Sequence, residues 1–180
     1  MKTLIAFLVL SASSVSAQQR PPVDTAGAPH AVLMRFAGEW EALGRMWRSE
    51  DPSVAPAEGK VRFSSEMVMD GRFLVERMAS QPPSRPFQQV RVFGYDNLSR
   101  RYEGAIYDSG GTNIIRTVAE LSPSGDFVFI YTYTDLGTRA SVTRRTVRKL
   151  LSQNEWIETA FESTGRGERK VTEIHARKTP

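Results

Sequence analysis

Short runs of alternating apolar and polar residues fill most of the chain after residue 38, and clusters of turn residues separate them. Such alternation over several residues is typical of half-buried strands. Asp70-Gly71, directly after the second run, is a strong hairpin signal. We therefore predict ten strands, over residues 39–49, 60–69, 72–80, 87–95, 100–108, 113–121, 127–134, 139–150, 155–163 and 169–178.

A helical pattern precedes the first strand. Val32, Leu33 and Phe36 fall at helical spacing, Pro29 suits a first turn, and Gly38 ends the run. The pattern predicts a short helix over about residues 29–36.

Ten strands joined by short turns, without helices between them, favour an antiparallel up-and-down meander. Closing the sheet removes its two free edges, which would otherwise promote aggregation. The strand at 87–95 is mixed on both faces, with Gln89 and Arg91 beside Phe93 on one of them. A partly polar barrel interior tolerates this pattern better than a sandwich core does, so we predict an all-β, antiparallel up-and-down barrel of about ten strands.

The N-terminus has the features of an export signal. Lys2 precedes an apolar run at 4–10 that is too short to span a bilayer, and Val15-Ser16-Ala17 suits a signal peptidase. We expect a cleaved signal peptide at 1–17, a flexible leader at 18–29, and a single domain at 30–178 that is periplasmic or secreted. The chain has no cysteine, which excludes both a lipoprotein anchor and disulfide bonds.

The charge pattern argues against nucleic-acid binding. The net charge is +4, and the arginines are scattered along the chain rather than clustered with aromatic residues. We expect a solvated basic surface, with an anion-attracting cavity as the alternative. No nucleic-acid partner is predicted.

Several short motifs together resemble a known family. They are HAVLMRFAGEWE (30–41), MW (46–47), GRFL (71–74), FGYDNLSRRYEG (93–104), YD (107–108) and VTEIHARK (171–178). The set resembles the bacterial domain-of-unknown-function family numbered 1579, a group of secreted, lipocalin-like proteins. The resemblance covers most of the chain after His30 and implies a fold and export, not a chemistry.

The same resemblance suggests a structural role for Trp40 and shows two positions where this chain differs from the usual family sequence. In lipocalin-like barrels a short helix and a Gly-x-Trp sequence lead into the first strand, and the tryptophan packs across the closed end. We therefore expect the helix to close one end and Trp40 to act as a structural plug. The family usually has a tryptophan where this chain has Ile106 and a tyrosine where it has Ala176, so a pocket lined there would be roomier.

Signals for catalysis are few. The only histidines are His30 and His175, and no zinc motif, nucleophile elbow or P-loop is present. We predict no catalytic residue, no metal site and no cofactor. Haem ligated by His175 stays an alternative, although its neighbours on the same strand face, Glu173 and Arg177, look solvent-facing. An enzyme that uses a buried acid pair such as Asp108 with Glu158 also stays open.

Tyrosines and arginines on the strands are the best candidates for lining a pocket. The predicted ligand-binding residues are Arg72, Arg91, Tyr95, Tyr107, Tyr131, Tyr133 and Arg144. We predict a barrel that binds a small amphipathic or apolar ligand, with an anionic group left open. The main alternative is a solid barrel that serves as an envelope structural or interaction protein, and an enzyme on the same scaffold comes third.

Overall fold

The computed structural model describes residues 25–51, 53–135, 137–164 and 167–180. The predicted signal peptide and residues 18–24 of the predicted leader lie outside the described residues.

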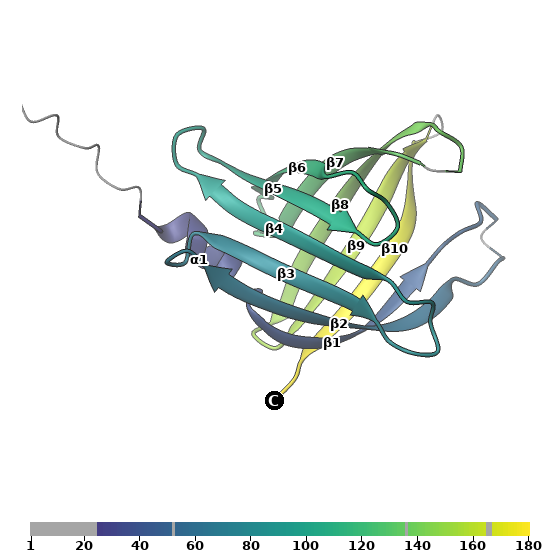
Figure 1. Cartoon of the computed structure of the whole chain (residues 1–180), viewed down its shortest axis with the longest axis horizontal. Coiled ribbons are helices and arrows are strands. Elements are labelled where there is room, and N and C mark those ends of the chain that lie inside the picture. The colour runs from purple at the N-terminus through teal and green to yellow at the C-terminus, as the bar shows by residue number, and fades with distance from the viewer. Residues whose placement is uncertain (1–24, 52, 136, 165–166) are drawn as a thin grey trace, which may run out of the picture.

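Ten strands form one closed antiparallel barrel, in the order β1-β10-β9-β8-β7-β6-β5-β4-β3-β2 (Figure 1). Each strand pairs with its neighbours in sequence, and the pairing of β1 with β10 closes the ring. The strands are β1 Gly38–Met46, β2 Ala57–Val68, β3 Phe73–Ser80, β4 Gln88–Asp96, β5 Arg101–Asp108, β6 Ile115–Leu121, β7 Phe127–Thr134, β8 Ser141–Ser152, β9 Glu155–Thr164 and β10 Gly167–Lys178. The predicted fold class is confirmed.

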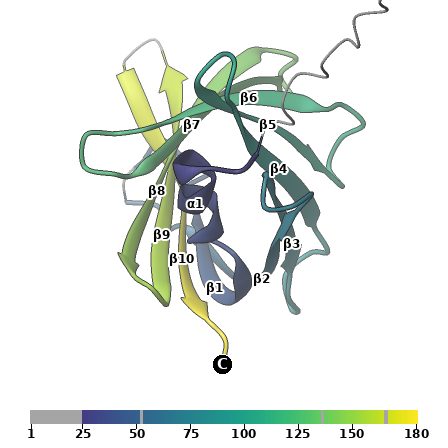
Figure 2. The same cartoon turned by 90° about the vertical axis from the view of Figure 1, so that its left-hand side faces the viewer.

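A short helix, α1 (Ala28–Met34), lies in one end of the barrel (Figure 2). The backbone N–H of Gly27 donates to His30 Nδ1 at 3.0 Å. The hydroxyl of Tyr102 donates to the carbonyl of Pro29 at 2.9 Å, which ties the first turn to β5. Leu33 is fully buried, so the apolar face of the helix closes this end.

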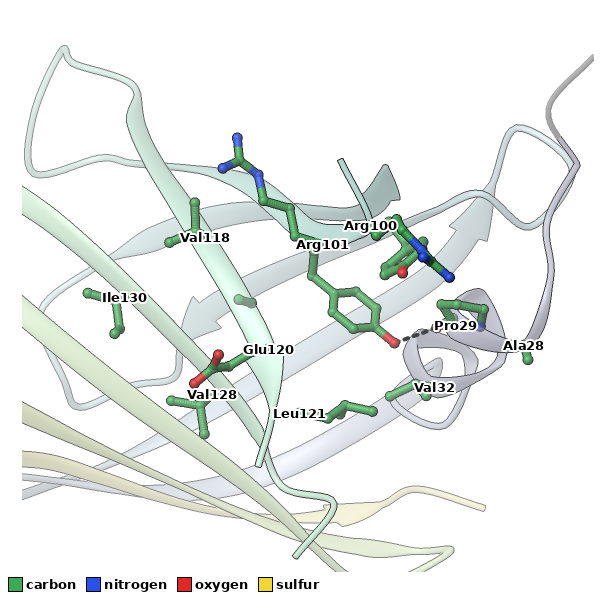
Figure 3. A pocket seen from close by; sticks show the side chains of 13 residues that line it. Ala28, Pro29, Val32, Arg100, Arg101, Val118, Glu120, Leu121, Val128 and Ile130 are labelled. Carbon is green, nitrogen blue, oxygen red and sulfur yellow. Dashed lines mark hydrogen bonds between the residues drawn. The ribbon is translucent and has the colours of Figure 1, made fainter. Parts of the chain in front are cut away.

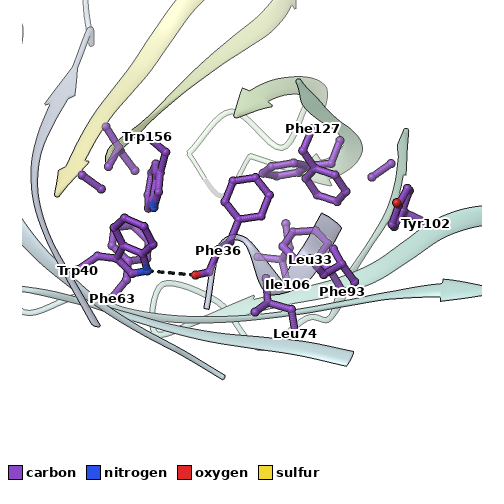
Figure 4. Packing of buried hydrophobic residues seen from close by; sticks show 14 of the residues in the cluster. Leu33, Phe36, Trp40, Phe63, Leu74, Phe93, Tyr102, Ile106, Phe127 and Trp156 are labelled. Carbon is purple, nitrogen blue, oxygen red and sulfur yellow. Dashed lines mark hydrogen bonds between the residues drawn. The ribbon is translucent and has the colours of Figure 1, made fainter. Parts of the chain in front are cut away.

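Aromatic rings fill the half of the barrel next to α1 (Figure 4). Trp156 makes T-shaped contacts with Trp40 and Phe63, at centroid distances of 5.8 and 5.2 Å. Trp40 Nε1–H donates to the carbonyl of Phe36 at 3.0 Å, so the indole satisfies its one donor just where the chain leaves the helix. Trp40 thereby joins α1 to the barrel wall at the closed end.

The two positions where the resemblance predicted a roomier pocket lie in this packed core. Ile106 and Ala176 are both buried among the core residues. They therefore help to fill the closed half and do not line the cavity in the open half.

Candidate functional site

Four charged side chains cross the middle of the barrel interior. Glu76 and Arg91 are cross-strand partners on β3 and β4, and Arg148 and Glu158 are partners on β8 and β9. Arg148 reaches across the barrel to Glu76 with two hydrogen bonds, of 2.6 and 3.0 Å. Arg91 reaches the other way and donates to both oxygens of Glu158 at 2.9 Å. We call these four residues the floor quartet.

The floor quartet is buried and internally neutral. All four residues are at most 7% exposed, and two arginines balance two glutamates. The Arg148 guanidinium lies 4.8 Å from the ring centroid of Trp156 and 5.0 Å from that of Phe36, against the aromatic core. The quartet therefore divides the interior into a packed closed half and an open half.

Acid should weaken the floor quartet through Glu158. Burial raises the pKa of this carboxyl, but the charges of Arg91 and Arg148 outweigh burial and hold the pKa below its ordinary value of 4.5. A carboxyl whose pKa is lower in the folded state stabilises the fold above its unfolded pKa and loses that contribution as the pH falls through the folded pKa. We expect the difference in unfolding free energy between wild type and Glu158→Gln to be largest at neutral pH and to shrink below pH 4.5.

Urea titrations across this pH range measure that difference. The control is Glu66→Gln, an exposed glutamate paired with Arg77 on the outer surface, whose substitution should change stability little at any pH. A wild-type to Glu158→Gln difference that stays constant below pH 4.5 would contradict the assignment.

A second polar group lines the open half on the side of β7 to β10. Tyr131, Arg144, Glu162 and Arg169 are successive cross-strand partners on these four strands. Tyr133, two residues beyond Tyr131, donates its hydroxyl to Glu162 at 2.8 Å. We call these five residues the mouth cluster.

Arg144 is the centre of the mouth cluster. Its guanidinium pairs with Glu162 and donates to the Tyr133 hydroxyl at 2.9 Å. It also lies 5.1 Å from the ring centroid of Tyr133 and 6.0 Å from that of Tyr131. Arg169 approaches the same carboxylate from β10, with Nη2 3.5 Å from Glu162 Oε2. Two guanidinium groups thus converge on one carboxylate.

The electrostatics of the mouth cluster favour fixed protonation states. Burial raises the pKa of Tyr133, and hydrogen bonding to Glu162 adds to this, so the phenol stays protonated and able to donate. Burial also raises the pKa of Glu162, but its bonds to Arg144 and Tyr133 outweigh burial and lower the pKa. With two cations and one anion, the cluster carries a net charge of about +1.

Two donors of the mouth cluster are buried without an acceptor. Within the part of the chain that the structure describes, the Nε atoms of Arg144 and Arg169 are shielded from solvent and have no hydrogen-bond partner. A buried donor left unpaired costs about 1–3 kcal/mol. The cluster therefore has hydrogen-bonding capacity in excess of what its own residues use.

A cavity of about 420 Å³ lies on the opposite side of the open half. Side chains of β1, β2, β3 and β10 that face the barrel interior supply much of its lining, and the lining is mainly apolar. These residues include Gly44, Met46, Gly59, Val61, Met78, Thr172 and Ile174. We call this cavity the mouth pocket.

Arg169 connects the mouth cluster to the mouth pocket. Its Nη1 lies 3.4 Å from the carbonyl oxygens of both Trp47 and Ser49, in the segment that follows β1. Arg48 of that segment and Met46 at the end of β1 line the pocket. A ligand in the pocket would therefore have a guanidinium group at its border.

Two larger hollows lie toward the outside of the barrel. One, of about 710 Å³, lies between α1 and β5 to β7, where Val32, Leu121 and Ile130 line it (Figure 3). The other, of about 860 Å³, lies over the outer face of β4 to β7. Val118 and Ile130 line both and are 49% and 40% exposed, so both hollows are open grooves. We therefore place the candidate site in the mouth, although these grooves are larger.

The structure brings together only some of the predicted ligand-binding residues. Tyr131, Tyr133 and Arg144 belong to the mouth cluster, and Arg91 belongs to the floor quartet. Tyr95 packs against His30 and Tyr102 near α1, at the other end of the barrel.

Besides Tyr95, two more of the predicted residues do not face the interior of the open half. Arg72 lines a hollow at the α1 end together with His30 and Tyr95. Tyr107 follows the buried Ile106 on β5, so it points outward and is 42% exposed. The expectation that Tyr107 lines an interior pocket is corrected, because alternation along the strand puts it on the other face.

The residues considered for chemistry are engaged in other contacts. His175 lies on the outer face of β10, where Nε2 is 2.8 Å from a Glu155 carboxylate oxygen, so it does not reach the interior. Asp108 accepts the backbone N–H of Gly110 at 2.8 Å in the turn after β5. Glu158 is held by two arginines, and no group of metal-ligating side chains occurs among the described residues.

Four residues of these clusters were missed at the sequence level: Glu76, Arg148, Glu162 and Arg169. Each sits at an interior position of its strand: Glu76, Glu162 and Arg169 have a buried apolar residue two positions away, and Arg148 has the buried Thr146 and the partly buried Leu150. A charged residue within an otherwise apolar strand face is the signal that could have found them. Which charges meet depends on strand register across the barrel, which the sequence does not state.

Comparison with known proteins places the chain in a family. A family model described as "Protein of unknown function (DUF1579)" matches residues 25–178. The chain belongs to the DUF1579 family. No match to a curated protein was found.

Two solved structures show the same barrel fold as this DUF1579 protein. The S-type phycobiliprotein lyase CPES from Guillardia theta has a TM-score of 0.56 at 12% identity, over 86% of this chain and 94% of its own. Rv2717c from M. tuberculosis has a TM-score of 0.57 at 13% identity, over 87% of this chain and 100% of its own. In the described part of the chain, no helix has the length and hydropathy needed to cross a membrane.

Proposed function

We propose that this protein is an exported barrel that binds a small amphipathic or apolar molecule in the open half of its interior. The observation that carries the proposal is the mouth pocket of about 420 Å³, whose wall surface is mainly apolar and whose lining also includes charged side chains such as Arg48 and Arg85. Pockets for small molecules commonly measure about 300–1,000 Å³ and combine apolar walls with a few fixed polar groups.

The division of the interior supports this location. Aromatic side chains fill the closed half, and the floor quartet crosses the middle of the barrel. A ligand in the open half would therefore meet a rigid base, since the quartet is held by charge-assisted hydrogen bonds from opposite walls. Binding would need no rearrangement of the core.

Extraction of the protein from its native cells tests the proposal. We expect denatured wild-type protein to release one small molecule in near one-to-one ratio, detected by mass spectrometry. Val61→Trp should lose that molecule, because Val61 lines the pocket and an indole there takes up its space.

The matched control is Leu43→Trp, which adds the same ring on the outer face of β1, where Leu43 is 38% exposed. This variant should retain the molecule, and thermal unfolding should show that both variants fold. An empty extract from wild type and from Leu43→Trp would count against the proposal and favour a barrel that acts through its outer surface.

A further inference from the structure

We propose that the mouth cluster binds the carboxylate of an aromatic acid, with Arg144 and Arg169 as its cationic partners. The inference rests on the proposed function, because it assigns a chemical class to the molecule in the mouth pocket. It adds a polar recognition site to a cavity whose own lining is mainly apolar.

Charge is the first argument. The floor quartet pairs two arginines with two glutamates and has no charge left over. The mouth cluster sets two arginines against the single carboxylate of Glu162. A ligand with one negative charge would neutralise the excess, and a neutral ligand would not.

Unused donors are the second argument. Among the described residues, Arg144 Nε and Arg169 Nε lack an acceptor but are shielded from solvent, whereas the two side chains as a whole remain 26% and 29% exposed and are accessible to a ligand. A guanidinium group presents its donors in a planar fork that matches the two oxygens of a carboxylate. Glu162 already shows that these side chains accept a carboxylate in this place.

The aromatic rings beside the arginines indicate that the part of the ligand attached to the carboxylate is aromatic. Phe129 and Tyr131 are stacked at 6.2 Å with an interplanar angle of 15°, and Tyr133 continues the row at 6.1 Å. Tyr131 and Tyr133 are only partly buried, so part of each side chain stays open to the barrel mouth. An aromatic ligand could pack against them in offset or edge-to-face geometry.

The position of Arg169 indicates where the carboxylate of the ligand would lie relative to the mouth pocket. It lies on β10 three residues before Thr172, which lines the mouth pocket. It also contacts the segment after β1, whose Arg48 lines the same pocket. A carboxylate at Arg169 would therefore lie at the border between the mouth cluster and the mouth pocket. Arg169 is accordingly the residue whose loss should affect anion binding most directly.

The outer face of the same strands supplies a matched control. Arg145, next to Arg144 in sequence, points outward and pairs with Glu168 at 2.6 Å, next to Arg169 in sequence. This pair has the same chemistry on the same two strands, but it lies outside the barrel.

Calorimetric titration with 2-naphthoate and its neutral amide, 2-naphthamide, tests the inference. We expect wild type to bind the acid at least about tenfold more tightly than the amide, the scale of one charge-assisted contact. Arg169→Gln should remove most of this preference, because it weakens binding of the acid more than binding of the amide. Glu162→Gln should strengthen acid binding, because the resident carboxylate no longer competes for the arginines. Arg145→Gln and Glu168→Gln should match wild type.

The outcomes separate this inference from the proposed function. Equal affinity for acid and amide in wild type would overturn the anion site and leave the pocket in place. No binding of either compound would count against the pocket itself and overturn the inference with it. A preference for the acid that Arg145→Gln removes as fully as Arg169→Gln does would show a general surface charge effect and overturn the site.

Discussion

Replacing Arg148 with methionine is expected to lower the unfolding free energy by about 3–5 kcal/mol, the usual cost of removing one partner from a buried ion pair. Arg148 is fully buried and serves both Glu76 and Glu158. Methionine replaces roughly the aliphatic part of the side chain, lacks the guanidinium group, and leaves two carboxylates in the interior with one arginine between them. Urea unfolding at neutral pH measures the loss.

The control for Arg148 is Arg145→Met, three positions earlier on β8. Arg145 pairs with Glu168 on the outer face, where an exposed ion pair contributes about 0–1 kcal/mol. The two substitutions therefore remove the same group from opposite faces of one strand. Similar losses for both, or a loss below about 1 kcal/mol for Arg148→Met, would show that the floor quartet does not stabilise the fold as described.

Burying the four charges of the floor quartet costs desolvation free energy that apolar side chains would not cost. Buried ion pairs often stabilise no more than apolar residues of the same volume would, because each charge loses its hydration. The quartet does, however, link β3 and β4 to β8 and β9 across the interior, which apolar side chains cannot do with directed bonds. We infer that these bonds hold the floor quartet in place as a boundary between the packed half of the interior and the mouth pocket.

The elements were predictable because their signals are local. Alternation and turn residues gave the strands to within about three residues at nearly every boundary, and β7 begins and ends at the predicted residues. The helix was expected at about residues 29–36 and spans Ala28–Met34. Each of these predictions depends only on residues that are close in sequence, because local backbone geometry determines which of their side chains share a face.

The clusters were only partly predictable because their contacts are long-range. Arg148 and Glu76 are 72 positions apart, and Arg91 and Glu158 are 67 apart. Strands that lie opposite in a barrel share no sequence signal that pairs their side chains. Tyr131, Tyr133 and Arg144 were named for their residue types, and they meet because the consecutive strands β7 and β8 pair. The contribution of Arg169 depends on β10 closing next to the segment after β1.

Replacing Trp40 with alanine is expected to cost about 3–5 kcal/mol of unfolding free energy, as for other large aromatic residues in cores. Trp40 is 1% exposed, contacts Trp156, and donates its indole N–H to the carbonyl of Phe36. Alanine removes both the ring packing and the hydrogen bond that holds the end of the helical segment to β1. Trp40→Phe should cost less, about 1–3 kcal/mol, because it keeps an apolar ring and leaves one carbonyl without its donor.

Trypsin cleavage gives a second measure of the same role. Arg35 is exposed at the C-terminal end of α1, and Arg62 lies within β2. If Trp40 holds α1 in the barrel end, Trp40→Ala should speed cleavage after Arg35 before cleavage after Arg62 becomes measurable. The matched substitution is Trp47→Ala, since Trp47 is partly exposed and lies over Lys170 at 4.3 Å, and it should cost about 1 kcal/mol or less. Equal losses for the two tryptophans, with no selective cleavage after Arg35, would show that Trp40 is an ordinary wall residue. The helix α1 would then stay in place through its other contacts, such as those of Leu33 and the bond from Tyr102 to Pro29.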